Sequence, residues 1–349
     1  MKTENTATDL NRNLNKPHAQ KGIAFKATNS INMNKIKQNE KIKFSPITLD
    51  DKTTYEDYFY KEERIIGECE RGCEFSFANL YLWGRQNMAK LRGHLLLLSQ
   101  FDERFVYPYP LGAGDKKPVI DAIIEDSKAR GIPCIITGLT PSARQTLEEL
   151  YPESFSFQSN EGSYDYVYSI NDLAELSGKK YHGKRNHLYR FKEAHPTYLA
   201  EPLTEDNISK AEEMAEEWYE KRLSENPDAD FHMEKAALKK AMRDFRELQM
   251  EGLAISENGK ILAFTFASRL SEDTFDVHFE KAFSGIQGAY VAINYEFARY
   301  IRAKYPNVKF LDREEDMGIE GLRKAKRSYH PDRMIKKYKA YLTRTFADE

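Results

Sequence analysis

Strand-like and helix-like segments follow the same order in both halves of this chain, and that order limits the folds open to it. The first half is expected to hold a strand meander, then a helix, a strand and a helix, at residues 89–92, 94–101, 104–109, 115–129, 132–137 and 141–150. The second half is expected to repeat this order at residues 252–257, 260–270, 274–281, 289–304, 308–311 and 319–329. The pattern predicts an α/β (α+β) fold of two similar units, each with a mixed central sheet flanked by helices.

The join between these units is expected near residues 171–178. We therefore divide the chain into a basic tail (1–43), an N-terminal unit (44–176) and a C-terminal unit (177–349). The tail carries nine Lys/Arg and three Asp/Glu with one aromatic residue, a composition typical of disorder. It is either an inert solvated extension or a contact for RNA or anionic lipid. Other expected segments are helices at 50–62, 75–83, 179–193, 205–223 and 233–248, and strands at 164–170 and 334–342.

The composition indicates a reduced, globular protein. The 349 residues are 40% hydrophobic and 31% charged, and no apolar run approaches the roughly 20 residues that span a bilayer. No signal peptide opens the chain, so we expect a cytoplasmic location. The three cysteines, Cys69, Cys73 and Cys134, are too few for a disulfide framework. Cys69 and Cys73 lack a second cysteine or histidine pair nearby, so no metal site is predicted.

The strand expected at 274–281 alternates between apolar and polar residues. Its polar side chains, Asp276, His278 and Glu280, are expected on one face, opposite Phe275, Val277 and Phe279. Such a face is either a solvated edge or an acid/base platform. Because the strand lies between an apolar neighbour and a glycine-started helix, we take His278 and Glu280 as candidate catalytic residues.

Two glycines precede the helix at 289–304. Gly285 and Gly288 would leave the first backbone N–H groups of that helix free to bind phosphate. A tight turn would select the same residues, so both interpretations stay open.

A basic run at 179–192 holds six Lys/Arg and no acidic residue. On a helical wheel, Lys184 and Arg185 fall within or beside the inward face set by Leu188 and Phe191. A solvated charge run would keep its cations opposite the apolar stripe. The arrangement favours binding of phosphate or a nucleic-acid backbone, unless Gly183 breaks the helix.

The helix expected at 319–329 repeats this feature. Ile319, Leu322 and Tyr329 mark its inward face, Lys326 falls inside that face and Arg323 lies at its edge. A buried cation is costly unless an anion meets it. With the run at 179–192, these cations are predicted to form one cationic groove for a phosphorylated ligand.

Four acidic residues, Asp312, Glu314, Glu315 and Asp316, precede this helix. They cap the helix through its dipole or hold a substrate amine, and both roles can coexist. Arg313 lies among them and joins the candidate binding residues.

Four pieces of the sequence together resemble a bacterial family, with a domain of unknown function, that is grouped with the C-terminal domain of phosphatidylglycerol lysyltransferases. The resemblance covers about residues 44–345 and is most specific in the last piece. The pieces are Lys184-Arg185-Asn186, His278-Phe279-Glu280-Lys281, Gly288-Ala289-Tyr290 and Arg313-Glu314-Glu315-Asp316-x-Gly318-x-x-Gly321-Leu322-Arg323-x-Ala325-Lys326. Such proteins carry tandem GNAT-like domains, as do Fem-type transferases that use aminoacyl-tRNA. The resemblance implies that fold and an aminoacyl transfer from aminoacyl-tRNA to an amine or hydroxyl.

In that reaction His278 or Glu280 would help to deprotonate the acceptor, and backbone N–H groups at a strand splay would stabilise the oxyanion. The other candidate residues bind substrate or phosphate: Lys184, Arg185, Asn186, Gly285, Gly288, Asp312, Arg313, Glu315, Asp316, Arg323, Lys326 and Tyr329. No cofactor is required. The GNAT coenzyme-A loop, Gln/Arg-x-x-Gly-x-Gly/Ala, is incomplete because Ala282 or Phe283 takes its first place. An acetyl-CoA-dependent acetyltransferase is therefore less favoured.

A third hypothesis, after aminoacyl transfer and acetyl transfer, is a non-catalytic module that binds RNA or a phosphorylated small molecule. The membrane-spanning half of the lysyltransferases has no counterpart here, which argues against a phosphatidylglycerol acceptor but leaves peripheral membrane contact open. The sequence does not determine the oligomeric state or the amino acid transferred.

Overall fold

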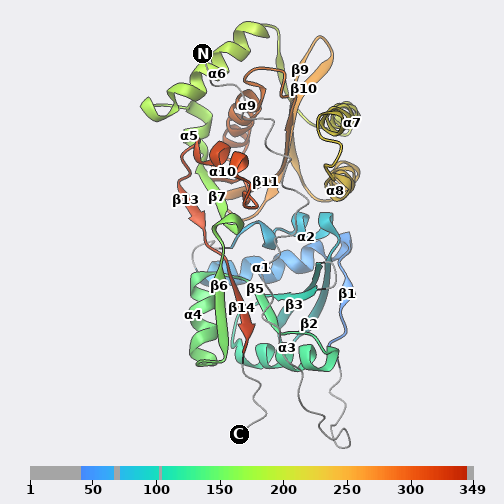
Figure 1. Ribbon diagram of the computed structural model, residues 1–349, viewed down its shortest axis with the longest axis vertical. Coiled ribbons are helices and arrows are strands. Elements are labelled where there is room, and N and C mark those ends of the chain that lie inside the picture. The colour runs from blue at the N-terminus through green and yellow to red at the C-terminus, as the bar shows by residue number, and fades with distance from the viewer. Residues whose placement is uncertain (1–40, 67–70, 102–103, 344–349) are drawn as a thin grey trace, which may run out of the picture.

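The computed structural model describes residues 41–66, 71–101 and 104–343, which form two sheets stacked along the long axis of the molecule (Figure 1). The predicted disordered tail lies outside the described residues except for 41–43. Each sheet has seven strands. No helix within the described ranges is both long and apolar enough to cross a membrane.

The first sheet forms the lower half of Figure 1. Its strands lie in the order β1 (Ser45–Pro46), β2 (Gln86–Leu91), β3 (His94–Phe101), β4 (Arg104–Pro108), β5 (Ile135–Leu139), β14 (Tyr338–Leu342) and β6 (Phe155–Ser159). Its helices are α1 (Lys52–Ile66), α2 (Phe77–Trp83), α3 (Lys117–Arg130) and α4 (Pro141–Leu150). Strand β3 carries four consecutive buried leucines, Leu95 to Leu98, because it lies inside the sheet with both faces covered.

The second sheet forms the upper half. Its strands lie in the order β13 (Arg333–Ile335), β7 (Asp165–Ser169), β12 (Phe310–Asp312), β11 (Thr274–Ala282), β10 (Lys260–Arg269), β9 (Glu251–Glu257) and β8 (Leu199–Pro202). Its helices are α5 (Ile170–Glu175), α6 (His182–Ala194), α7 (Ile208–Glu225), α8 (His232–Arg243), α9 (Ala289–Lys304) and α10 (Glu320–Arg327). Helices α5, α6 and α9 cover one face, and α7 and α8 cover the other (Figure 1).

The two sheets share one pairing pattern. In each, three antiparallel pairs are followed by one parallel pair and then two more antiparallel pairs. The repeat predicted from the order of segments is therefore present in the fold.

In each sheet, the strand next to one edge comes from the other half of the chain: β14 in the first sheet and β7 in the second. Strand β7 follows β6 in the sequence but pairs with β12 and β13, whereas β14 returns from the C-terminal half to lie between β5 and β6. The predicted boundary between residues 176 and 177 therefore does not coincide with the division between the sheets. The physical reason is that β5 and β6 leave a gap which an antiparallel partner fills.

Strands β11 and β12 form the parallel pair of the second sheet and separate after a short contact. They pair only over Thr274–Asp276 and Phe310–Asp312, and β11 then continues to Ala282 without β12. This separation is the strand splay expected from the resemblance. It leaves the residues of β11 after Asp276 without β12 as a neighbour.

A β-bulge at His278 overturns the predicted alternation of β11. Phe266 pairs with Phe279 and Ala267 with Val277, so His278 is the extra residue on its strand. Val277 packs in the core beneath α9, whereas Phe279 packs in the core beneath α7 and α8. Asp276 and Glu280 therefore point to opposite faces, because a bulge shifts the alternation by one residue.

Candidate active site

Two polar clusters flank the splay, one on each face of the second sheet. We call the first the Glu280 cluster, which consists of Lys184, Glu280, Asn294, Arg313 and Tyr329. We call the second the His278 cluster, which consists of Asp276, His278, Asp312 and Glu314. The corresponding place in the first sheet, after the parallel pair of β4 and β5, holds the buried apolar side chains Tyr109 and Leu111 instead.

An ion pair forms the centre of the Glu280 cluster. Arg313 Nη2 donates to Glu280 Oε1 over 2.8 Å, and the two side chains are 14% and 13% exposed. Asn294 of α9 donates to the other Glu280 oxygen over 3.4 Å. The Arg313 guanidinium also lies 5.0 Å from the ring centroid of Tyr329, which holds it in place by a cation–π contact. Its Nη1 atom is buried without a hydrogen-bond partner among the described residues.

Lys184 approaches this pair from α6. Its Nζ lies 3.6 Å from the ring centroid of Tyr329, and no acceptor in the described part of the chain receives a hydrogen bond from it. Burial and the charge of Arg313 lower the pKa of Lys184 to about 8, although Glu280 opposes the shift. A pKa this close to neutral pH suits an amine that both accepts and donates a proton.

The neighbours of Lys184 point elsewhere. Arg185 Nη1 donates to the carbonyl oxygens of Leu176 (2.5 Å) and Gly178 (2.6 Å), where it closes the turn after α5. Asn186 is exposed and contacts His182 at 3.2 Å. The structure thus brings Lys184, but not Arg185 or Asn186, to the Glu280 cluster.

Lys326 is buried as predicted, but protein oxygens meet it instead of a ligand. Its Nζ donates to the carbonyl oxygens of Arg313, Glu314 (3.0 Å) and Glu315 (2.6 Å). The cation thereby shapes residues 313–318, which we call the acidic loop. The predicted phosphate contact of Lys326 is not needed to explain its burial.

Arg323 is also held by the acidic loop. It forms a bidentate pair with Asp316 at 2.7 and 3.0 Å, and Tyr166 donates to the same carboxylate over 2.7 Å. Burial tends to raise the pKa of Asp316, but the hydrogen bonds from Arg323 and Tyr166 outweigh it and lower that pKa. Arg323 and Asp316 therefore fasten α10 to the loop.

Close packing between helices explains Gly288. It caps α9 with φ +81°, and a Cβ there would lie 2.3 Å from the carbonyl oxygen of His187 in α6. A side chain is excluded by both the backbone conformation and the neighbouring helix. Gly285 is exposed and has no such contact, since Lys221 Nζ is 3.5 Å from its Cβ position.

The two basic segments predicted to form a groove meet where the chain enters α6 and leaves α10. Tyr181, immediately before α6, donates to the carbonyl oxygen of Tyr329 over 2.9 Å, and His330 contacts the carbonyl oxygen of Lys180 at 3.2 Å. The exposed cations on these helices and their ends are Lys179, Lys180, Arg190, Lys324 and Arg327.

His278 is the centre of the second cluster. Its side chain is 3% exposed, and its Nε2 lies 2.8 Å from Ser268 Oγ. Its Nδ1 lies 3.3 Å from Glu314 Oε1 and 3.5 Å from Asp276 Oδ2. Both ring nitrogens thus face protein groups, which does not favour the predicted role of His278 as a base that touches substrate.

Two buried carboxylates stand beside His278. Asp276 and Asp312 are register partners in the parallel pair, and both are fully buried. Burial, followed by the charges of Glu314 and Asp312, raises the pKa of Asp276 well above its usual range. Burial and Asp165 do the same to the pKa of Asp312.

The sequence analysis did not identify a further polar group near the acidic loop. Lys337 Nζ lies 2.7 Å from Asp165 Oδ1 and 2.7 Å from Glu74 Oε2, and Cys73 donates its backbone N–H to Asp165 over 2.8 Å. Burial, opposed by Lys337, raises the pKa of Glu315 to about 7. The segment expected as a strand at 334–342 contains Lys336, Lys337 and Lys339, but nothing in that sequence indicates that Lys337 is the buried one.

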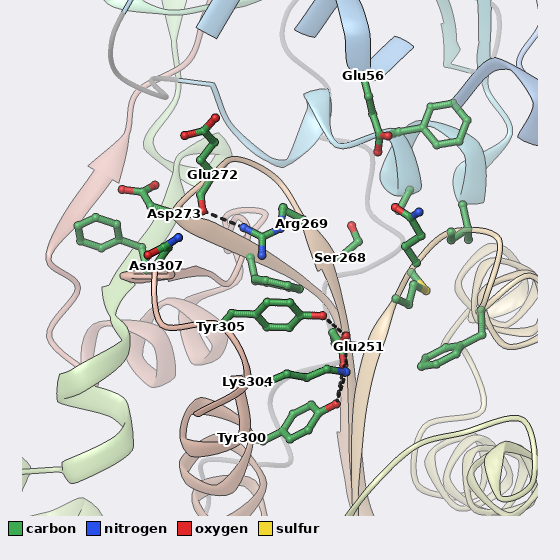
Figure 2. A pocket seen from close by; sticks show the side chains of 18 of the residues that line it. Glu56, Glu251, Ser268, Arg269, Glu272, Asp273, Tyr300, Lys304, Tyr305 and Asn307 are labelled. Carbon is green, nitrogen blue, oxygen red and sulfur yellow. Dashed lines mark hydrogen bonds and ion pairs between the residues drawn. The ribbon is translucent and has the colours of Figure 1, made fainter. Parts of the chain in front are cut away.

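A cleft of about 2240 Å³ separates the two units on the β10 side (Figure 2). Glu56 of α1 lines it from the first unit, and Ser268, Arg269 and Glu251 line it from the second. Figure 2 shows Glu251 surrounded by Tyr300, Lys304 and Tyr305, all of which donate hydrogen bonds to it. Ser268 lines the cleft and contacts His278, so the His278 cluster lies directly behind this wall of the cleft.

Comparison with known families agrees with this arrangement. The family described as phosphatidylglycerol lysyltransferase, C-terminal, matches residues 69–341. The chain belongs to this family. The resemblance inferred from the sequence motifs is thereby confirmed, as is the expectation of a GNAT-like transferase fold.

Solved structures show the same fold. A conserved protein of unknown function from Bacteroides thetaiotaomicron is 38% identical, with a TM-score of 0.80 over 86% of this chain and 99% of that one. L-PGS from Bacillus licheniformis is 16% identical, with a TM-score of 0.58 over 82% of this chain and 92% of that one. FemX is 9% identical, with a TM-score of 0.54 over 85% of this chain and 97% of that one.

One curated relative also matches. An uncharacterised protein of Mycoplasmoides gallisepticum is 24% identical over 182 residues, which is 51% of this chain and 56% of that protein. The match thus spans little more than half of its length.

Proposed function

We propose that this protein transfers an aminoacyl group from an aminoacyl-tRNA to an amine or hydroxyl acceptor. The observation that carries this proposal is the position of Lys184, a half-buried amine without a hydrogen-bond acceptor among the described residues, beside the Glu280–Arg313 pair at the splay. Family membership and the fold shared with L-PGS and FemX support the same reaction class. Fold alone does not assign chemistry, so the residues at the splay are decisive.

The reaction is an attack of the acceptor nitrogen or oxygen on the ester carbonyl of the aminoacyl group. Neutral Lys184 takes the acceptor's proton, and the resulting ammonium returns a proton to the ribose oxygen that leaves. The pKa of about 8 suits both steps near neutral pH. Glu280, oriented by Arg313, stabilises the Lys184 ammonium and directs its amine toward the splay.

The oxyanion of the tetrahedral intermediate requires donors that are already in place. Backbone N–H groups of β11 beyond Asp276 supply them, because β12 no longer pairs with this edge. Arg313 Nη1, buried without a partner among the described residues, adds a second donor.

The tRNA would lie across the exposed cations of α6 and α10. The residue before α6, Tyr181, contacts Tyr329 after α10, and Tyr189 of α6 is 65% exposed and available for stacking on a base. Binding by such cations releases counterions and weakens steeply with salt.

The test is transfer from tRNA charged with labelled amino acids to amine acceptors or to phosphatidylglycerol vesicles. Lys184→Ala is expected to lower the rate about 100-fold or more while tRNA affinity stays within about threefold. Lys128→Ala, at an exposed lysine of α3 in the first unit that pairs with Glu125, is the control and is expected to retain the rate. Absence of transfer from every aminoacyl-tRNA, or transfer from acetyl-CoA instead, would refute the proposal.

A further inference from the structure

The His278 cluster buries carboxyl oxygens that the described residues leave without a partner. Asp276 is fully buried, and neither of its carboxylate oxygens has a hydrogen-bond partner among the described residues. Asp312 Oδ2 is unpartnered in the same way. Burial of a carboxylate without a partner is costly, so the site calls for a positive group.

The neighbouring lysines do not supply that group. Lys326 donates to three backbone carbonyl oxygens of the acidic loop, and Lys337 pairs with Asp165 and Glu74. Cys73, Glu74 and Asp165 form a second set of ligand-type atoms in the described residues, but there Lys337 already serves as the cation. Within the described part of the chain, the only basic side chain paired directly with Asp276 is the imidazole of His278.

Three side chains around His278 are close enough together to bind one metal ion. The ligand atoms of Asp276, His278 and Glu314 lie within 4.8 Å of one another. The distances from His278 Nδ1 to Glu314 Oε1 and to Asp276 Oδ2 are 3.3 and 3.5 Å. A tetrahedral ion with bonds of roughly 2.0–2.1 Å has ligand–ligand edges of roughly 3.3–3.4 Å, which these distances match.

The second ring nitrogen of His278 also has the kind of contact expected of a metal ligand. Metal-bound histidines use their second ring nitrogen to contact a polar group that fixes the ring. Here His278 Nε2 lies 2.8 Å from Ser268 Oγ, which in turn lies 3.3 Å from Ser76 Oγ of the first unit. Ser268 also lines the interdomain cleft, so an ion would enter from that side (Figure 2).

We propose that Asp276, His278 and Glu314 bind a divalent metal ion, with Zn²⁺ as the best fit to one imidazole and two carboxylates. Asp312, the register partner of Asp276, supplies the unpartnered oxygen nearest to this set on β12. The ion links the acidic loop to β11 at the start of the splay. The site is separate from the Glu280 cluster, and the proposal stands whether or not the protein transfers aminoacyl groups.

The test is direct metal analysis of the untagged full chain after incubation with ZnCl₂ and removal of free ion. One equivalent of zinc is expected by inductively coupled plasma mass spectrometry, together with tetrahedral visible bands after Co²⁺ substitution. Asp276→Asn and Glu314→Gln are expected to lose the bound ion. Ser268→Ala is expected to weaken affinity about tenfold, because it removes the group that orients His278.

Controls separate this site from alternatives. Cys73→Ser disrupts the other ligand-type set and is expected to retain the zinc equivalent. Glu314, whose side chain is 24% exposed, provides a variant that folds even if Asp276→Asn does not. Wild-type protein that binds no zinc, or zinc that survives in both carboxylate variants, overturns the proposal. So does stabilisation by lysine amide without stabilisation by zinc, which would identify the cluster as a site for an amine.

Discussion

The Lys337 ammonium lies 2.7 Å from the carboxylate of Asp165, at the point where two strands exchange between the sheets. Lys337 stands between β13 of the second sheet and β14 of the first, and Asp165 begins β7. The Asp165 side chain is fully buried and that of Lys337 is 11% exposed. This ion pair therefore joins the crossing segments inside the protein.

Replacement of this lysine should destabilise the whole fold. Lys337→Met leaves the buried Asp165 and the partly exposed Glu74 without their cation, and breaking a buried pair from one side costs about 3–5 kcal/mol. Urea unfolding monitored by circular dichroism measures the loss. The neighbouring exposed residue gives the control, Lys336→Met, which should change the free energy of unfolding by less than about 0.5 kcal/mol. Equal stability of the two variants would contradict this account of the pair.

A methyl group at Gly288 should force α6 and α9 apart. Gly288→Ala places a Cβ 2.3 Å from the His187 carbonyl oxygen at φ +81°, so we expect a loss of at least about 2 kcal/mol in the free energy of unfolding. Gly285→Ala meets only the Lys221 ammonium at 3.5 Å and should be close to neutral. Thermal unfolding of both variants makes the comparison. If Gly285→Ala were the more harmful change, the phosphate interpretation of these glycines would regain support.

Because of Lys184, the free energy of unfolding should change with pH in the alkaline range. The pKa of Lys184 is lowered to about 8 in the folded protein, below the ordinary value of 10.5, so burial of its charge destabilises the fold fully below pH 8. Between about pH 8 and 10.5 the unfolded chain holds a proton that the folded chain has released, and the free energy of unfolding rises with pH. Lys184→Met removes this dependence.

The prediction compares the free energy of unfolding of wild type with that of Lys184→Met at two pH values. Lys184→Met should be more stable than wild type at pH 7, and its advantage should shrink by about 1–2 kcal/mol by pH 9.5. Denaturant titrations at both pH values provide the measurement. A constant advantage would mean that Lys184 keeps an ordinary pKa in the folded protein.

Arg323 should protect the acidic loop against acid. Arg323→Gln removes a bidentate partner of the buried Asp316, and we expect a loss of about 2 kcal/mol at pH 7 because Arg323 itself is 29% exposed. The pKa of Asp316 is lowered in the folded state, so its contribution is present above pH 3.8 and is lost as pH falls below that value. Acid unfolding should therefore occur at higher pH in Arg323→Gln than in wild type. Lys324→Gln, exposed on the same helix, should match wild type.

Local periodicity predicted much of the fold. Strand β3 and helices α4 and α9 have the bounds expected from the sequence, because each has a strong apolar pattern and clear end signals. Strands β6 and β8 were not predicted. They are short, β6 is mostly polar, and β8 is exposed throughout, so their pairing depends on neighbouring strands instead of their own composition.

The sequence did not predict contacts between segments that are far apart in the chain. Residues 334–342 looked like one strand, but the chain passes from one sheet to the other at Lys336 and Lys337. The bulge at His278 depends on the register of β10, which the alternation of β11 alone does not reveal. Helical spacing correctly indicated that Lys326 is buried, yet its acceptors are backbone carbonyl oxygens of the acidic loop, which side-chain patterns do not display.

The position of β14 has a consequence for synthesis. The strand fills the place between β5 and β6, although the ribosome makes it after the entire second unit. Until it emerges, the edges of both partner strands are open to pairing with other chains. The first unit therefore cannot mature during translation ahead of the second, and a nascent chain stalled before residue 338 should be a substrate for chaperones or proteases.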